Sequence, residues 1–227
     1  MLLIDGDIIT YRAAFSREAE DFDDLMRIAD QHVKHIVANA DPKIKHYCVY
    51  LTGSNNFRKD IAVTAPYKGN RKEKPPYLDD IRDHLLEHHT SHLSDGEEAD
   101  DKIAIMATEL GASAVICSID KDFDQVPGWH YNFVKNTRYC IGTQEGLFNF
   151  YCQILTGDAV DNIIGIKGIG PLKARKALID CSDEVAMYAK CVEMYDNNAD
   201  RVIENGRLLW LRRHEGQMWE PPTSATC

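Results

Sequence analysis

The sequence lacks several features that mark other classes of protein. No apolar run reaches the roughly 18–20 residues that a membrane-spanning helix needs, so we expect no membrane partner. The seven cysteines form no C-x-x-C pair, which argues against a disulfide framework or a zinc site and favours reduced thiols in a cytoplasmic chain. The nine histidines include no H-E-x-x-H spacing, and no nucleophilic serine or cysteine elbow is present.

Positive charge is also scarce. The chain has 26 lysines and arginines against 36 aspartates and glutamates, a net charge of −10, and this balance by itself disfavours nucleic acid as a partner. The distribution is uneven, however. From Arg58 to Lys74 six cations face two acids, whereas acids are concentrated between Asp95 and Asp101. Such a pair of segments is typical of an enzyme that binds phosphates and cations, and equally of two solvated surface segments.

The order of apolar segments predicts an α/β fold. Short runs at 2–4, 47–51 and 114–119 indicate buried strands, and helical spacing of apolar residues over 22–37 and 99–110 indicates helices between them. Alternating strands and helices predict a mainly parallel central sheet flanked by helices. With 227 residues, 44% of them hydrophobic, we expect a single domain over 1–227. Residues 55–92 form an excursion from the sheet, basic and proline-containing in its first part.

Two pairs of aspartates follow predicted strands directly. Asp5 and Asp7 come after the run at 2–4, and Asp120 and Asp122 come after the run at 114–119. The carboxyl ends of parallel strands meet at one edge of a sheet, where ligands bind. One such pair is weak evidence because aspartates often cap turns and helices; two pairs predict a shared acidic site.

Two further acidic groups lie downstream. Glu98, Asp100 and Asp101 stand at the start of a predicted helix. Their alternative role is structural, since Ser94 with Glu97 fits a capping box and acids are favourable at a helix N-terminus. Asp158 and Asp161 are one helical turn apart, and capping or simple solvation would also explain them.

The chemistry that explains so many acids is metal binding. Carboxylates a few ångströms apart repel one another, and hard divalent cations remove this repulsion. Two Mg²⁺ ions about 4 Å apart can activate water and stabilise the leaving oxygen of a phosphodiester, and Mn²⁺ can substitute for them. No nucleotide cofactor is expected. The predicted ligands are Asp5, Asp7, Glu98, Asp100, Asp101, Asp120, Asp122, Asp158 and Asp161.

The segment 163–178 matches a helix-hairpin-helix. An apolar-Gly-apolar-Gly pattern precedes a helix whose inward residues are Ala174, Ala177 and Leu178. The glycines permit a tight turn with exposed amides, and these, with the helix N-terminus, suit a DNA backbone phosphate. A glycine-rich connection between packed helices is the alternative. The predicted DNA-binding residues of this sub-region (155–180) are Gly165, Lys167, Gly168, Gly170, Lys173 and Lys176.

Taken together, these motifs resemble the 5′-nuclease (flap endonuclease) family, which includes the 5′-nuclease domain of bacterial DNA polymerase I, and most closely its phage 5′-3′ exonucleases. The family's order is kept over roughly residues 1–180: Leu-Ile-Asp-Gly-Asp at 3–7, Tyr-Lys-Gly-Asn-Arg at 67–71, Glu-Ala-Asp-Asp at 98–101, Ser-Ile-Asp-Lys-Asp at 118–122, Gly-Asp-Ala-Val-Asp-Asn at 157–162, and the hairpin. For a phage-encoded chain the cytoplasm would be the host's.

The resemblance implies a PIN-like fold and a structure-specific nuclease acting on DNA with 5′ ends, flaps or nicks. By a two-metal mechanism it would leave 5′-phosphate and 3′-hydroxyl groups. Asp5, Glu98, Asp100 and Asp101 would hold mainly one metal, and Asp120, Asp122, Asp158 and Asp161 the other. Residues 55–92 would form the family's arch, where Lys68 and Arg71 contact the scissile phosphate and Arg58, Tyr67 and Lys72 bind DNA. The hairpin would also bind K⁺.

One position departs from the family. The family has an aspartate after the strand at 47–51, where residues 51–58 here read Leu-Thr-Gly-Ser-Asn-Asn-Phe-Arg. Asp7 is placed to supply the missing charge. Otherwise a weaker first metal site, slower activity or a preference for Mn²⁺ is expected.

Three other functions remain open at this stage. A haloacid-dehalogenase-type phosphatase would use Asp5 as nucleophile and Thr52 later in its sheet, but leaves the acids at 98–101 and the hairpin unexplained. A non-catalytic DNA-junction-binding protein with a lapsed metal site would account for the missing aspartate. A ribonuclease would share the acid-lined sheet.

Overall fold

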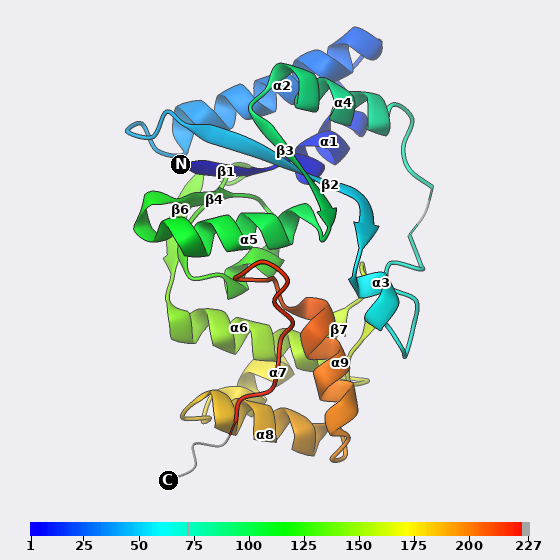
Figure 1. The fold of residues 1–227 in the computed structure, drawn as a ribbon, viewed down its shortest axis with the longest axis vertical. Coiled ribbons are helices and arrows are strands. Elements are labelled where there is room, and N and C mark those ends of the chain that lie inside the picture. The colour runs from blue at the N-terminus through cyan, green and yellow to red at the C-terminus, as the bar shows by residue number, and fades with distance from the viewer. Residues whose placement is uncertain (72, 224–227) are drawn as a thin grey trace.

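The computed structural model describes residues 1–71 and 73–223. Its centre is a six-stranded sheet in the order β3–β2–β1–β4–β5–β6 (Figure 1). The strands are β1 (Leu2–Asp5), β2 (Tyr47–Asn56), β3 (Ser91–Gly96), β4 (Val115–Cys117), β5 (Gly128–Asn132) and β6 (Thr137–Ile141). Neighbours pair in parallel except for β5 with β6. The predicted mainly parallel sheet is therefore confirmed.

Helices cover both faces of this sheet. On one side lie α1 (Gly6–Ala14), α2 (Phe22–Asn39) and α4 (Leu78–His88); on the other lie α5 (Ala99–Leu110) and the 3-10 helices η1 (Gly111–Ser113) and η2 (Lys121–Gln125). Alternation along β1 divides its side chains between the two faces. Leu2 and Ile4 pack with α1, α2 and α4, and Leu3 packs with α5.

A helical layer follows the sheet in sequence and lies beside it. It contains α6 (Thr143–Thr156), the short strands β7 (Gly157–Asp158) and β8 (Ile163–Ile164), α7 (Pro171–Leu178), α8 (Glu184–Met194) and α9 (Ala199–Leu209). Phe150, Tyr151 and Leu178 belong to its own apolar cluster. The short helix α3 (Arg58–Ile61), which follows β2, packs against α9.

The predicted strands and helices are found with few changes. Strand β3 was not predicted because its residues, Ser-His-Leu-Ser-Asp-Gly, are mostly polar, as an edge strand allows. The predicted capping box of Ser94 with Glu97 is wrong. Ser94 lies in β3, the helix begins at Ala99, and the Glu98 backbone N–H donates to Asp101 at 3.2 Å.

Residues 55–92 are only partly an excursion. β2 continues to Asn56, α3 follows, and α4 packs against α1 and α2. The irregular part comprises 62–71 and 73–77, and Lys72 lies outside the described residues. In the part of the chain that the structure describes, no helix is both long and apolar enough to cross a membrane.

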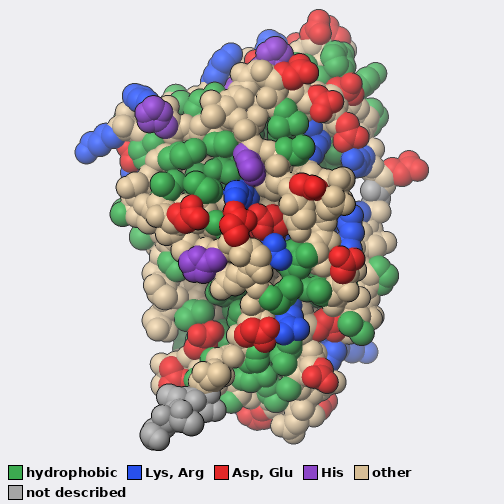
Figure 2. Space-filling model, in the orientation of Figure 1, with side chains coloured by type: hydrophobic (Ala, Val, Ile, Leu, Met, Phe, Trp, Pro, Cys, Tyr) green, Lys and Arg blue, Asp and Glu red, His purple; other side chains and the backbone are tan. Residues whose placement is uncertain are grey.

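The C-terminal tail, which sequence patterns did not place, runs back across the molecule. In Figure 1 the red segment leaves α9, passes beside α5 and then descends past α6. Trp219 is buried against Phe150 and Tyr151, and Gly206 is required there because a Cβ would overlap the indole ring. Figure 2 shows this face, on which acidic and basic side chains are interspersed.

Candidate active site

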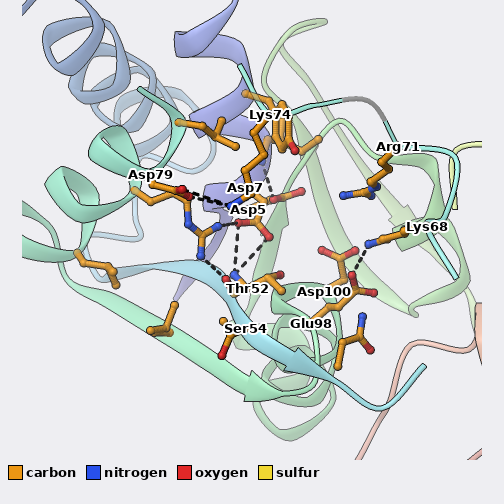
Figure 3. A pocket seen from close by; sticks show the side chains of 18 of the residues that line it. Asp5, Asp7, Thr52, Ser54, Lys68, Arg71, Lys74, Asp79, Glu98 and Asp100 are labelled. Carbon is orange, nitrogen blue, oxygen red and sulfur yellow. Dashed lines mark hydrogen bonds and ion pairs between the residues drawn. The ribbon is translucent and has the colours of Figure 1, made fainter. Parts of the chain in front are cut away.

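A cavity of about 660 Å³ opens beside the carboxyl ends of the parallel strands. The predicted acids Asp5, Asp7, Glu98, Asp100 and Asp120 line it, and Figure 3 shows Asp5 and Asp7 on one side with Glu98 and Asp100 on the other. Asp5 ends β1, Asp120 follows β4, and Glu98 caps α5. The parallel topology thus brings together acids that are more than a hundred residues apart in sequence.

Asp5 and Asp100 carry no cationic partner among the described residues. Asp5 accepts hydrogen bonds from the Ser118 hydroxyl at 2.7 Å and the Ile8 N–H at 3.1 Å. Burial, partly offset by Ser118, raises the pKa of Asp5 to about 7. Burial and then the neighbouring Asp5 and Glu98 carboxylates raise the pKa of Asp100 well above its usual value. Both groups are therefore poised to lose charge unless a cation joins them.

Asp120 and Asp122 form a second crowded pair. Asp120 accepts the Asp122 backbone N–H at 2.9 Å, and Asp122 accepts from the Gln153 amide at 2.5 Å. Burial raises the pKa of Asp120, while burial with the charges of Asp120 and Asp158 raises the pKa of Asp122 to about 7. Asp158 accepts the Val160 N–H at 2.7 Å and lies 3.4 Å from the Lys121 ammonium.

The two predicted catalytic cations, Lys68 and Arg71, pair with acids of the site. The Lys68 ammonium pairs with Glu98 (Figure 3), it lies 3.7 Å from Asp161, and Arg71 lies 3.1 Å from Asp161. Burial raises the pKa of Glu98, but the charges of Lys68 and Arg58 outweigh it and lower this pKa to about 2. Glu98 and Asp161 are thus already neutralised, unlike Asp5 and Asp100.

The donor set fits a divalent cation. Among the described residues no three acidic, histidine or cysteine side chains already converge as a complete set of metal ligands. The crowded acids nevertheless present only carboxylate oxygens, which are the ligands of hard ions such as Mg²⁺ and Mn²⁺. A divalent cation would relieve the repulsion that raises the pKa values of Asp5, Asp100 and Asp122.

The interpretation of Arg58 and Asp101 requires correction. Arg58 was expected to bind DNA and Asp101 to bind metal, yet their side chains are 1% and 0% exposed. Arg58 donates to both Asp101 oxygens, at 2.5 and 2.9 Å, and Asp101 does not line the cavity. They form a buried, bidentate ion pair behind the site, so neither reaches solvent or substrate.

Tyr67 was also expected to contact DNA, and this too is corrected. Tyr67 is 7% exposed, and its hydroxyl lies 2.7 Å from Glu98 and 2.8 Å from Asp161, so its single proton is shared between these two carboxylates. Burial and the Glu98 charge raise the pKa of Tyr67 well above its usual value, so the phenol stays protonated and keeps donating. Tyr67 therefore orients two acids of the site.

Asp7, the proposed substitute for the missing family aspartate, lines the cavity and is paired with a cation. Arg82, from α4, donates to Asp7 at 2.8 Å and also to the Thr52 carbonyl. The Thr52 N–H donates to Asp7 at 3.3 Å, and the Thr52 hydroxyl accepts the Ala99 N–H at 2.9 Å. Sequence patterns gave no sign of Arg82, since nothing local links it to Asp7. The occupied Thr52 hydroxyl also weakens the phosphatase alternative.

The predicted hairpin is present between β8 and α7. Ala174 and Leu178 are buried, Gly170 caps α7, and Gly168 has a φ of +81° in the turn. Lys167, Lys173 and Lys176 are exposed, although Lys173 donates to the Gly168 carbonyl at 2.8 Å. Gly165 has a packing role instead, because a Cβ there would overlap the Thr156 backbone.

Similarity to known proteins agrees with this geometry. The family model described as 5′-3′ exonuclease, N-terminal resolvase-like domain, matches residues 1–150. The chain belongs to this family. The match contains the elements that carry Asp5, Glu98, Asp100 and Asp120, but it ends before Asp158, Asp161 and the hairpin.

Two individual relatives match different shares of the chain. Flap endonuclease Xni of Shewanella piezotolerans is 33% identical over 165 residues, 65% of this chain and 64% of that protein. The Shewanella sediminis protein of the same name is 29% identical over 92% of this chain and 87% of its own length. The first of these alignments spans less than two thirds of the relative.

The fold also matches a solved structure. T5 5′-exonuclease with bound divalent zinc ions superposes with a TM-score of 0.72 at 18% identity, covering 92% of this chain and 88% of the other. At this identity the match establishes the fold, which therefore extends over both the sheet and the helical layer.

Proposed function

We propose that this member of the 5′-3′ exonuclease family is a Mg²⁺-dependent 5′-nuclease that hydrolyses DNA phosphodiesters near 5′ ends, flaps or nicks. Mn²⁺ can replace Mg²⁺, and the products carry 5′-phosphate and 3′-hydroxyl groups. The supporting observation is one cavity in which Asp5, Asp100 and Asp120 face the cations Lys68 and Arg71. Acids without counter-charges suit metal ions, and cations on the opposite wall suit a phosphate.

The acids and the cations of the site would have different roles. Asp5, Asp100, Asp120 and Asp122 would hold the divalent ions, with Glu98, Asp158 and Asp161 completing the set. When bound, two such ions polarise the phosphate and stabilise charge on the attacking and leaving oxygens. Lys68 and Arg71 would leave their acidic partners to stabilise negative charge developing on the phosphate.

The hairpin would hold the duplex at a distance from the cut. Gly168 leaves open space in the turn that precedes the N-terminus of α7, where a phosphate oxygen would bind. Exposed Lys167 and Lys176 add attraction that does not depend on base sequence. A potassium ion bridging the turn to a phosphate belongs to the same proposal.

Digestion of 5′-labelled flap, nicked and blunt DNA in EDTA, Mg²⁺ and Mn²⁺ tests this function. We expect cutting near the 5′ end in either metal and none in EDTA, with products that a ligase accepts because they carry 5′-phosphate. Cutting in EDTA would contradict metal catalysis. RNA of the same structure tests the ribonuclease alternative directly.

A DNA-junction-binding protein without catalysis is the second candidate. It is favoured by the absence of an acid from residues 51–58, where the family has an aspartate, and by the neutralisation of Asp7 by Arg82. Tight flap binding in EDTA with no cutting in Mg²⁺ or Mn²⁺ would establish it.

We further propose that residues 1–227 act as one nuclease unit in the cytoplasm. Contacts of the tail with α5 and η2 support a single unit. Cys48, Cys117, Cys140, Cys152, Cys181 and Cys191 are free thiols, which is consistent with a reducing compartment.

A further inference from the structure

The segment Leu208–Arg213, here called the brace, joins α9 to the tail and touches both carboxylate-bearing elements from behind. It lies beyond residues 1–150, where the family model matches. In Figure 1 it passes between the end of α9 and α5. Leu211 packs in the apolar cluster shared with α5 and η2, and the polar contacts of the brace are hydrogen bonds to buried groups, which fix both distance and direction.

On the α5 side the contact runs through Arg58 and Asp101. Arg58 donates to the Leu208 carbonyl and to the Trp210 carbonyl, each at 2.8 Å, and also forms the ion pair with Asp101. The Arg212 N–H donates to Asp101 at 3.1 Å. Asp101 in turn accepts the Glu98 N–H, so the brace holds the first turn of α5, from which Glu98 and Asp100 project.

On the η2 side the contact runs through Gln125, which is 2% exposed. Its amide nitrogen donates to the Leu209 carbonyl at 2.9 Å, and its amide oxygen accepts the Leu211 N–H at 3.0 Å. Arg213 donates to the Gln125 backbone carbonyl at 2.9 Å. Gln125 is the last residue of η2, the element that carries Asp122 and begins after Asp120.

Stability alone does not account for this arrangement. A buried ion pair is seldom more stabilising than apolar residues of the same size. Here Arg58, Asp101 and Gln125 are all buried, and their hydrogen bonds tie three chain segments into one geometry. The acids on the front of these segments repel one another, so something behind them has to set their separation.

We propose that the brace sets the spacing between the two carboxylate groups, and that Arg58 and Gln125 are positioning residues of the active site. The inference rests on the proposed metal site and extends it to a part of the chain outside the matched family domain. Displacing either contact would let η2 or the start of α5 shift, and the ions would lose ligands without any loss of a DNA contact.

Gln125→Leu and Arg58→Lys test the proposal. Leucine keeps the volume but loses both amide bonds, and lysine keeps the charge beside Asp101 but cannot reach both carbonyls. Residues that orient metal ligands typically change metal affinity or activity by about 10–100-fold. We therefore expect calorimetric Mn²⁺ affinity without DNA to fall about tenfold or more, and kcat to fall with KM for DNA nearly unchanged.

Val33→Ala is the matched control, because Val33 is buried in α2, in an apolar cluster that contains no residue of the brace. It should lower stability while leaving Mn²⁺ affinity within about twofold. If folded Gln125→Leu keeps the Mn²⁺ affinity and kcat of the wild type, the proposed role of the brace is wrong, whereas the nuclease proposal stands. That variant decides the question if Arg58→Lys does not fold. A wild-type protein that binds no Mn²⁺ would overturn the metal site and the brace together.

Discussion

Two groups of carboxylates share this site, and they differ in what neutralises them. Asp5, Asp100 and Asp120 have no ion pair among the described residues, and Asp122 meets only the exposed Lys121, 3.9 Å away; burial raises the pKa values of all four acids. Glu98, Asp101 and Asp161 are paired with Lys68, Arg58 or Arg71. Acids that look alike in the sequence therefore differ in the structure, where only their counter-charges separate proposed metal ligands from members of ion pairs.

The sharpest test of this division compares Asp120 with Asp7. Asp120→Asn should reduce nuclease activity by about four orders of magnitude, or ~5 kcal/mol in the barrier, because an uncompensated metal ligand is lost. Asp7→Asn should reduce nuclease activity by less than about tenfold, since Asp7 forms an ion pair with Arg82. Initial rates on labelled flap DNA measure both, with flap affinity as the check on folding. Equal losses of activity in the two variants would contradict the division between acids with and without a counter-charge.

Substitutions in the ion-paired group should change the free energy of unfolding. Arg58→Met leaves Asp101 buried and unpaired, which should lower the free energy of unfolding by about 3–5 kcal/mol. Arg71→Met, whose ion pair with Asp161 is half-exposed, should cost less than about 1 kcal/mol. Urea denaturation measures both values.

The double variant Arg58→Met with Asp101→Leu sharpens the result. It removes the unpaired charge, so it should recover much of the stability lost in Arg58→Met while leaving the first turn of α5 without its contact to the brace. A double variant as unstable as the single one would argue that the pair stabilises the fold through its charges.

A third comparison sets Lys68 against Lys74, since both line the cavity. Lys68→Ala should lower kcat about a hundredfold with little change in flap affinity, because its charge stabilises the phosphate as negative charge develops. Lys74, whose pair with Asp79 is exposed, should change kcat only a few-fold when replaced by alanine. Single-turnover rates at saturating enzyme separate the chemical step from DNA binding. A Lys68→Ala variant impaired mainly in binding would make Lys68 a tether.

Much of the fold could be predicted, because its signals are local. Branched apolar runs marked β1, β2 and β4, and helical spacing marked α2 and α5. Parallel pairing of these strands then predicts that Asp5 and Asp120 lie at one edge of the sheet. The site was less predictable, since partners decide the role of a charge. Arg58 sits in a basic stretch, yet it is buried by Asp101 and by carbonyls some 150 residues downstream. Arg82 meets Asp7 only through the packing of α4 on α1.

A further expected effect is a pH dependence of stability in the metal-free protein. The folded pKa of Asp122, about 7, lies above its ordinary value of 3.8, so the folded state holds this proton more tightly than the unfolded state. Its contribution to stability is therefore complete below about pH 4 and is lost as pH rises toward 7. Asp122→Asn removes the group, so the variant's stability relative to wild type should rise by ~3 kcal/mol across that window. Chemical denaturation in EDTA at pH 4, 5, 6 and 7 measures this difference. A constant difference would mean that Asp122 is not crowded by Asp120 and Asp158, and would move it out of the group of uncompensated ligands.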